Sequence, residues 1–306
     1  MSSSKNDTVE IPAIPNAPVI LAPSFSASAR VETAGLSHPG KVRANNEDHF
    51  LIGRFGRFFE TLQSNVPQGE IPSRVEETGY GFLVADGVGG SAAGEMASKL
   101  AISTLVNLFL QTPDWILRLE EIPSIEEVMR RTAERYEQVN LAMAEQAQQD
   151  PELRGFATTL TLAASLGRYL FVAHVGDSRA YLLRKSKLHR LTRDHTLAQT
   201  MAQLGLINQE QVAAHHLRHV VLKVLGDRSR RAEPDVHQHG LDDGDGLLLC
   251  TDGLTEMVAE NNIAEILNGS ETAHAGCQNL IDAALKAGGK DNVTVVFARY
   301  QFEPNE

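Results

Sequence analysis

The segment Phe82–Gly90, read as FLVADGVGG, constrains the fold more than any other stretch of the chain. Four residues that favour a buried strand, Phe82–Ala85, lead directly into Asp86 and then into a cluster of glycines. Glycine permits the sharp turn that such a strand end needs. The residues Ala93–Gln111 then carry apolar side chains at helical spacing. The sequence therefore predicts a strand, an acidic turn and a helix, a pattern that is also typical of an ordinary turn.

Acidic residues stand at the ends of several other predicted strands. Asp177 and Asp252 each follow an apolar run, whereas Asp48 and Asp291 each precede one. Antiparallel pairing places a strand that begins with an acid beside a strand that ends with one, at the same edge of the sheet. The sequence thus predicts that six acids, far apart in the chain, converge: Glu47, Asp48, Asp86, Asp177, Asp252 and Asp291.

Clustered carboxylates repel one another, and a divalent cation removes that cost. Oxygen ligands without a Cys or His pattern select Mg²⁺ or Mn²⁺ over Zn²⁺. The carboxylates suffice for two ions about 3.5–4 Å apart, which would lower the pKa of a bridging water and offset charge on a transferring phosphoryl group. Arg43 precedes this cluster and is placed either to grip a phosphate or to be a solvated surface charge. Because His215, His216 and His219 are crowded and have no cysteine nearby, no zinc site is predicted there.

Composition and charge narrow the class of protein. The net charge of −11, from 39 acidic and 28 basic residues, argues against a nucleic-acid partner. No run of about 18 apolar residues occurs, so no membrane span is expected, and the N-terminus lacks a signal pattern. The two cysteines, Cys250 and Cys277, lie in apolar contexts and predict reduced thiols in a cytoplasmic protein. Residues 1–28, rich in Ser, Pro and Ala, predict a disordered tail.

Residues between the acidic motifs predict the remaining elements. Two segments are interpreted without regular strands: residues 53–79 as a long hairpin connection in which Phe55, Phe58 and Phe59 cover the sheet, and residues 197–226 as an inserted helical or flexible segment. Strands are expected at Val31–Ser37, His49–Ile52, Thr158–Leu166, Tyr169–Val175, Ala180–Arg184, Leu247–Thr251 and Val293–Tyr300. Helices are expected at Ser124–Ala147, Leu197–Leu204, Gln209–Ala214 and Thr272–Ala287.

Seven motifs, in order and spacing, resemble those of the metal-dependent type 2C (PPM) family of serine/threonine protein phosphatases. They are RANNED, ADGVGG, GFATTL, HVGDSRAY, RDHT, LCTDGL and KDNVTVV, and the resemblance covers roughly residues 31–300. It implies an α+β fold with four α-β-β-α layers, in which two antiparallel sheets are flanked by helices. It also implies a bacterial, single-domain type, with a catalytic domain over residues 29–303 and a mobile flap near the substrate at about 197–226.

The resemblance assigns roles to the residues of the acidic cluster. Asp86 is similar to the ligand that bridges two ions, with the Gly87 carbonyl on one of them. Asp252 and Asp291 match the ligands of the other ion. Asp177 matches a ligand of a third, weaker ion that it shares with Asp252.

Three further residues take roles from the same resemblance. Glu47 and Asp48 match residues that are either ligands or neighbours of ligands, and Arg43 matches the phosphate anchor. One departure is Val88, where some members have a histidine assigned as general acid. A second is Phe156-Ala157, where many bacterial members have Met-Gly, a change expected to affect packing alone.

The implied activity is hydrolysis of phosphoserine and phosphothreonine on proteins by a hydroxide that bridges two Mg²⁺ or Mn²⁺ ions. The implied partners are phosphorylated proteins and Ser/Thr kinases, for a monomer without nucleic-acid or membrane contacts. Two alternatives stay open: a module of the same fold that grips phosphoproteins or a kinase without turnover, and a small-molecule phosphohydrolase. The complete carboxylate set argues against the first alternative, and no additional pocket signature supports the second.

Overall fold

The computed structural model describes residues 29–67, 69–89, 91–111, 125–150, 153, 155–226 and 233–302. The predicted tail at residues 1–28 and Ser124, the expected first residue of a helix, lie outside the described residues. Two five-stranded antiparallel sheets form the centre of the molecule.

The first sheet contains the C-terminal strand and its neighbours. In spatial order its strands are β1 (Ala29–His38), β12 (Val293–Phe302), β11 (Gly246–Cys250), β8 (Arg179–Arg184) and β9 (Lys187–Arg190). Three helices pack on its outer face. They are α5 (Asp252–Thr255), α6 (Glu260–Gly269) and α7 (Ala273–Lys286).

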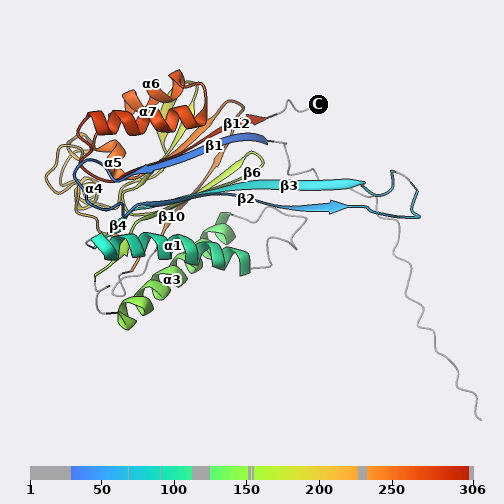
Figure 1. The fold of residues 1–306 in the computed structure, drawn as a ribbon, viewed down its shortest axis with the longest axis horizontal. Helices are drawn as coiled ribbons and strands as arrows, with labels where there is room; N and C mark the ends of the chain where they lie inside the picture. Colours follow the sequence, from blue (N-terminus) through green and yellow to red (C-terminus); the bar gives the residue numbers. More distant parts are fainter. Residues whose placement is uncertain are drawn as a thin grey trace, which may run out of the picture.

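The second sheet has two long helices on its outer face, α1 (Ser91–Gln111) and α3 (Ile125–Gln149) (Figure 1). In spatial order its strands are β10 (Asp235–Gly240), β7 (Tyr169–Val175), β6 (Leu160–Leu166), β3 (Arg74–Ala85) and β2 (His49–Glu60). The short strands β4 (Gly87–Val88) and β5 (Ala157–Thr158) pair beside it. The predicted four-layer arrangement is thus confirmed.

The alternation of side chains along each strand builds the layers. Phe82 and Val84 of β3 face the first sheet, whereas Leu83 and Ala85 face α1 and α3. Side chains of β11 alternate in the same way. Leu248 and Cys250 face α7, whereas Leu247 and Leu249 lie between the two sheets. Each predicted buried strand therefore serves two apolar layers at once, which explains its continuous apolar sequence.

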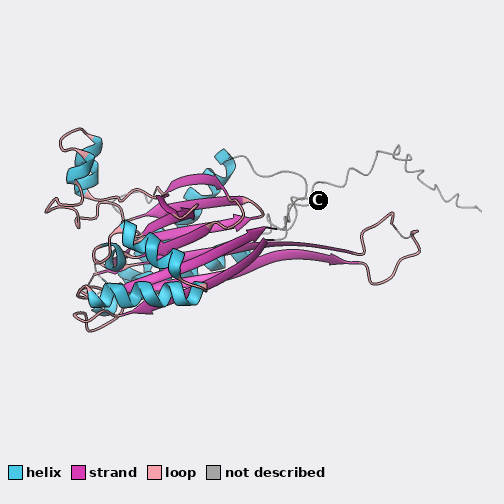
Figure 2. Cartoon of the chain, turned by 90° about the horizontal axis from the view of Figure 1, so that it is seen from above, coloured by secondary structure: helices cyan, strands magenta, loops and turns pink. Residues whose placement is uncertain are grey.

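The interpretation of residues 53–79 as an irregular connection was wrong. Strands β2 and β3 pair continuously from His49↔Ala85 to Glu60↔Arg74, and the outer part of this ribbon projects beyond the body (Figures 1 and 2). A Cβ added at Gly56, within this paired region, would lie 2.3 Å from the Glu77 carbonyl oxygen. The glycine therefore permits close strand contact and does not mark a turn.

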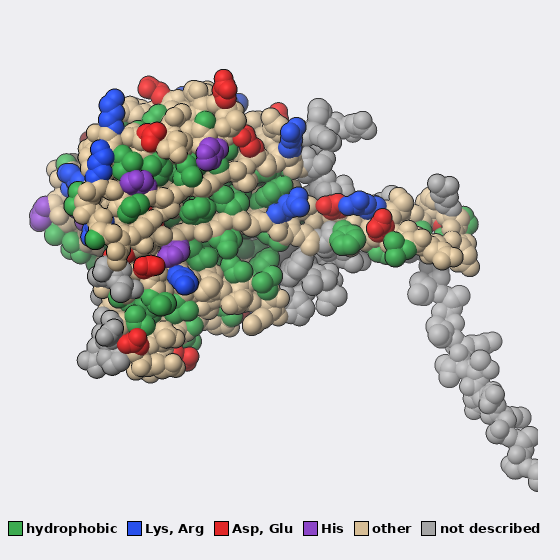
Figure 3. All heavy atoms as spheres, in the orientation of Figure 1, with side chains coloured by type: hydrophobic (Ala, Val, Ile, Leu, Met, Phe, Trp, Pro, Cys, Tyr) green, Lys and Arg blue, Asp and Glu red, His purple; other side chains and the backbone are tan. Residues whose placement is uncertain are grey.

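The expected cover of the sheet by three phenylalanines is correct for Phe55 alone. Its ring packs 5.2 Å from that of Phe109 in α1. Phe58 and Phe59, on the projecting ribbon, are 71% and 53% exposed. Figure 3 shows hydrophobic and charged side chains side by side on that ribbon.

The segment at 197–226 contains a short helix and a single 3₁₀ turn. Helix α4 (Leu197–Gln203) is capped at its N-terminus by Thr196, whose side chain accepts from the Gln199 amide. The expected second helix is only the 3₁₀ turn η2 (Gln209–Gln211). Among described residues, no helix is long and apolar enough to cross a membrane.

Candidate metal centre

The strand registers bring the predicted acids to one end of the molecule, where β4, α4 and α5 also lie (Figure 1). Asp48 directly precedes β2 and Asp86 directly follows β3, and His49 pairs with Ala85. Asp252 begins α5 after β11, and Asp291 precedes β12, which pairs antiparallel with β11. The predicted convergence of strand ends is confirmed, whereas the roles of the residues stay predictions.

Asp48 is the most deeply buried of these acids. The Thr251 hydroxyl donates to its Oδ2 at 2.8 Å, whereas its buried Oδ1 finds no hydrogen-bond partner in the described part of the chain. Burial, opposed by hydrogen bonds from Thr294 and Thr251, raises the pKa of Asp48 to about 7, and the charges of Asp252 and Asp291 add to the rise. A buried oxygen without a partner in an acidic surrounding suits a cation.

The neighbouring acids also disfavour one another's charge. Burial raises the pKa of Asp86 well above its ordinary value, and all four other aspartates of the cluster raise it further. Burial raises the pKa of Asp252 to about 6, helped by Asp291 and Glu256. The pKa of Asp177 is raised by burial, then by Asp252 and Asp194. This mutual repulsion is the cost that a bound cation would remove.

The carboxylates are electrostatically coupled but are not assembled around a point. Among the described residues, no three Asp, Glu, His or Cys side chains are grouped so that they could hold a metal ion. The residue types and the unpartnered Asp48 oxygen fit a divalent cation, but ligation requires the side chains to move closer together.

Glu47 reaches the cluster through a gap left by a glycine. A Cβ added at Gly94 in α1 would lie 2.0 Å from Glu47 Oε2, so only glycine leaves room for this carboxylate. The Glu47 carbonyl accepts from the Ser98 hydroxyl at 2.5 Å. Burial raises the pKa of Glu47, and Arg43 opposes that rise.

Arg43 lies at the edge of the cluster. Its guanidinium donates to Asp291 Oδ2 at 2.7 Å, and its side chain is 56% exposed. This hydrogen bond is the main reason that its pKa is raised. The exposed guanidinium has five N–H donors, so it can bind an anion while it contacts Asp291.

Asn292 holds the loop that carries Arg43 and Glu47, and sequence reasoning missed this role. Its Nδ2 donates to the carbonyls of Pro39 (3.0 Å) and Asn45 (2.8 Å), and its Oδ1 accepts from the Glu47 amide (2.8 Å). The sequence signal for this role is an asparagine that directly follows Asp291, just before a buried strand begins.

The turn that carries Asp177 is fixed by a histidine from the RDHT motif. His195 donates its backbone N–H to the Gly176 carbonyl at 2.7 Å, and its Nδ1 accepts from the Gly176 N–H at 3.2 Å. Its Nε2 lies 3.2 Å from Asp235 Oδ2. Nε2 makes no hydrogen bond within the described part of the chain, although Asp235 lies beside it. The two hydrogen bonds between His195 and Gly176 therefore hold the turn that leads into Asp177.

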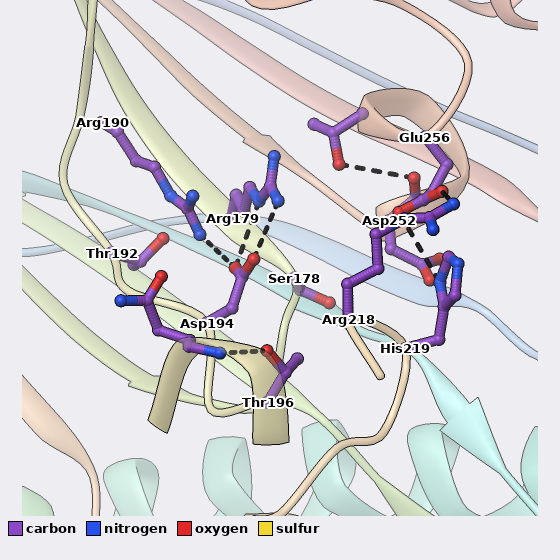
Figure 4. Close-up of polar contacts among 12 residues, drawn as sticks. Ser178, Arg179, Arg190, Thr192, Asp194, Thr196, Arg218, His219, Asp252 and Glu256 are labelled. Atoms are coloured by element: carbon purple, nitrogen blue, oxygen red, sulfur yellow. Dashed lines mark hydrogen bonds and ion pairs between the residues drawn. The ribbon is translucent and has the colours of Figure 1, made fainter. Parts of the chain in front are cut away.

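Asp194, from the same motif, accepts hydrogen bonds from two arginines beside this turn. Arg179 donates to both of its oxygens, at 3.1 and 2.8 Å, and Arg190 bonds it as well (Figure 4). The bidentate geometry fixes Arg179, which begins β8 two residues after Asp177.

A polar cavity of about 220 Å³ opens beside Asp177 and Asp252. Residues of the 197–226 segment line its other side, among them Arg218 and His219. The space is large enough for a side chain or several waters, and it adjoins two of the candidate ligands.

Comparisons with known proteins show which family has this sequence and fold. A family model described as "Protein phosphatase 2C" matches residues 67–285. The Mycobacterium tuberculosis "Serine/threonine protein phosphatase PstP" is 35% identical over 87% of this chain, which spans 44% of that relative's length. The "Serine/threonine phosphatase stp" of Listeria monocytogenes is 34% identical over 84% of this chain and 91% of its own.

A solved structure shares the fold over nearly the whole described chain. The catalytic domain of PstP in complex with two manganese ions superimposes with a TM-score of 0.68 at 32% identity, over 90% of this chain and 100% of that one. The chain belongs to the protein phosphatase 2C family.

Proposed function

We propose that this protein is a metal-dependent phosphatase that removes phosphate from phosphoserine and phosphothreonine on proteins. The observation that carries the proposal is the convergence of acids from both sheets at one end of a protein phosphatase 2C fold. The manganese ions in the similar PstP structure support divalent cations as cofactors. Phosphorylated proteins and the Ser/Thr kinases that produce them are the proposed partners. The buried, unpaired Cys250 and Cys277 support a cytoplasmic setting.

The proposed ligands follow the strand ends. Asp86 would help to hold two ions, together with the Gly87 carbonyl for one ion and with Asp252 and Asp291 for the other. Glu47 and Asp48 are proposed as ligands or as neighbours of ligands. Asp177, with Asp252, is the proposed ligand of a third, weaker ion. Bound there, Mn²⁺ or Mg²⁺ would supply an activated water and offset phosphoryl charge.

The chain's own residues orient the substrate. Arg43 is exposed at the edge of the cluster and is the proposed phosphate anchor. Asn292 keeps the Arg43 loop against β12, which fixes the distance between anchor and acids. Val88 is on the exposed side of β4 and cannot donate a proton, so either another group or a water protonates the leaving serine or threonine oxygen, or this oxygen leaves unprotonated.

Phosphate release from phosphoserine and phosphothreonine peptides tests the proposal directly. Chelator-treated protein should be inactive, and Mn²⁺ or Mg²⁺ should restore turnover. A binding module would retain phosphopeptides without releasing phosphate under any metal. A small-molecule phosphohydrolase would turn over small phosphate esters but not peptides. Full activity in excess chelator would contradict the metal centre.

Arg43→Ala should raise KM for phosphopeptides about ten- to a hundredfold and change kcat less. Loss of a charged hydrogen bond to phosphate costs about 1.5–3 kcal/mol, and that loss appears in binding. Arg74→Ala is a matched control, because Arg74 pairs with Glu76 on the projecting ribbon and is similarly exposed. A large fall in kcat with KM unchanged would instead place Arg43 in transition-state stabilisation.

A further inference from the structure

The outer part of the flap, residues 204–219, lies between two points where the chain is held. At its base, the Leu197 amide donates to the Val220 carbonyl at 2.8 Å, and the Leu222 amide donates to the His195 carbonyl at 2.7 Å. The base of the flap is therefore bound to the RDHT motif through the His195 carbonyl. Leu204 and Leu206, near the start of the outer flap, are 70% and 66% exposed. Apolar burial therefore does not fix the beginning of this segment.

The other end of the outer flap contacts the carboxylate of Glu256, in addition to the two hydrogen bonds that join Gln209 to Gln199. Arg218 donates to Glu256 Oε2 at 3.1 Å, and His219 Nδ1 lies 3.6 Å from Glu256 Oε1. Both oxygens of Glu256 thus face consecutive flap residues, as Figure 4 shows. The Arg218 and Glu256 side chains are 35% and 26% exposed, so this pair is less hydrated than an ordinary surface pair.

Glu256 connects the flap to the candidate metal centre. It is the C-cap of α5, the short helix that begins with Asp252. Arg218, His219 and Glu256 line the polar cavity together with Asp252 and Asp177. The Glu256 clamp therefore determines where the flap stands over the cavity next to these two acids.

We propose that Glu256 is a positioning residue that holds Arg218 and the outer flap over the cavity, and so shapes the space that receives the polypeptide around a phosphorylated residue. This inference rests on the proposed phosphatase function. Because this cavity adjoins Asp177 and Asp252 and has room for a side chain, a phosphopeptide bound at these acids would extend into it, whereas a small aryl phosphate would fill only the position of the phosphate. Glu256 should consequently influence peptide substrates and leave small esters largely unaffected.

Hydrogen exchange of the outer-flap amides tests the clamp without any substrate. In Glu256→Gln and Arg218→Ala, the amides of residues 204–219 should exchange several times faster than in the wild type, because each variant removes the same ion pair. Because Glu256→Gln also removes the contact with His219, the double variant should exchange no faster than Glu256→Gln alone. Glu134→Gln, which breaks an exposed Arg130 pair on α3, is the control and should leave the flap unchanged.

Kinetics then test the role in substrate binding. Glu256→Gln should raise KM for a phosphopeptide about three- to tenfold, the range expected for loss of a partly buried ion pair, with KM for an aryl phosphate unchanged. The reversed pair, Arg218→Glu with Glu256→Arg, should recover part of the peptide affinity. Unchanged flap exchange in Glu256→Gln, or equal KM changes for both substrates, would overturn the inference. Failure of the wild type to hydrolyse any phosphate ester would instead overturn the proposed function, and the exchange experiment would still decide the clamp.

Discussion

Replacing Asp86 by asparagine should lower phosphatase turnover by about a thousandfold or more. Asp86 is the one carboxylate whose pKa is raised by Asp48, Asp177, Asp252 and Asp291 together, so it stands at the electrostatic centre of the cluster. In the proposed role, Asp86 is a ligand of two ions, so its loss would remove several kcal/mol of charge stabilisation, and about 4 kcal/mol corresponds to a thousandfold in rate.

The fold should survive this substitution. Asp86 is held by its backbone: its amide donates to Thr159 Oγ1 at 3.0 Å, and its carbonyl accepts from Thr158 and Thr159. Because burial and repulsion disfavour the charged side chain, neutral asparagine should raise the melting temperature of the metal-free protein. Asp282→Asn, a change of the same chemistry on the exposed face of α7, should affect neither rate nor stability. Turnover retained in Asp86→Asn would show that the acid cluster is not the reaction centre.

Stabilisation of the protein by Mn²⁺ should increase steeply between about pH 5 and about pH 7.5. The pKa of Asp48 is about 7 and that of Asp252 about 6 in the folded protein, against 3.8 ordinarily. The folded state therefore binds more protons than the unfolded state between about pH 4 and pH 7, and this contribution destabilises the metal-free fold as pH rises through that window. A divalent ion binds the deprotonated acids. It therefore removes the destabilisation by their buried charges, which is largest at the upper end of this pH window.

The measurement is the difference in melting temperature between Mn²⁺ and chelator across this pH range. Buried His174, whose pKa burial lowers to about 3, destabilises the fold at acid pH. It acts in both conditions, however, and cancels in the difference. In Asp48→Asn the increase with pH should be smaller. A difference that stays constant from about pH 5 to about pH 7.5 would show that ions do not bind to the titrating acids.

Much of this arrangement could be predicted from sequence because it depends on local patterns. The apolar run before Asp86 and the run before Asp252 each predict a buried strand that ends at an acid, and both strands lie where expected. Whether each acid precedes or follows its strand is also visible in the sequence. With antiparallel pairing, that order is enough to place the acids at the same edge of the sheet. Strand β10 was missed because its sequence, DVHQHG, is polar at an edge of the sheet and has no apolar alternation.

The parts that sequence reasoning missed depend on contacts between distant residues. The projecting ribbon forms through pairing of β2 with β3, and its glycines had been interpreted as breaks. The hydrogen bond from Asn292 to the Pro39 carbonyl joins residues that are 253 positions apart. The hydrogen bond from Arg218 to Glu256 joins the 197–226 segment to the end of α5. Neither contact leaves a periodic signal in the sequence, since each is specified only by the folded geometry.

Calorimetric titration of Mn²⁺ into chelator-treated protein tests the central claim most directly, namely that the acids at these strand ends are a site for divalent ions. The wild type should bind two ions tightly, as in the similar PstP structure, and a third more weakly. Asp86→Asn should lose tight binding of both, whereas Asp177→Ala should lose only the weaker ion. A wild type that binds no Mn²⁺, or an Asp86→Asn variant that binds it as the wild type does, would contradict the account.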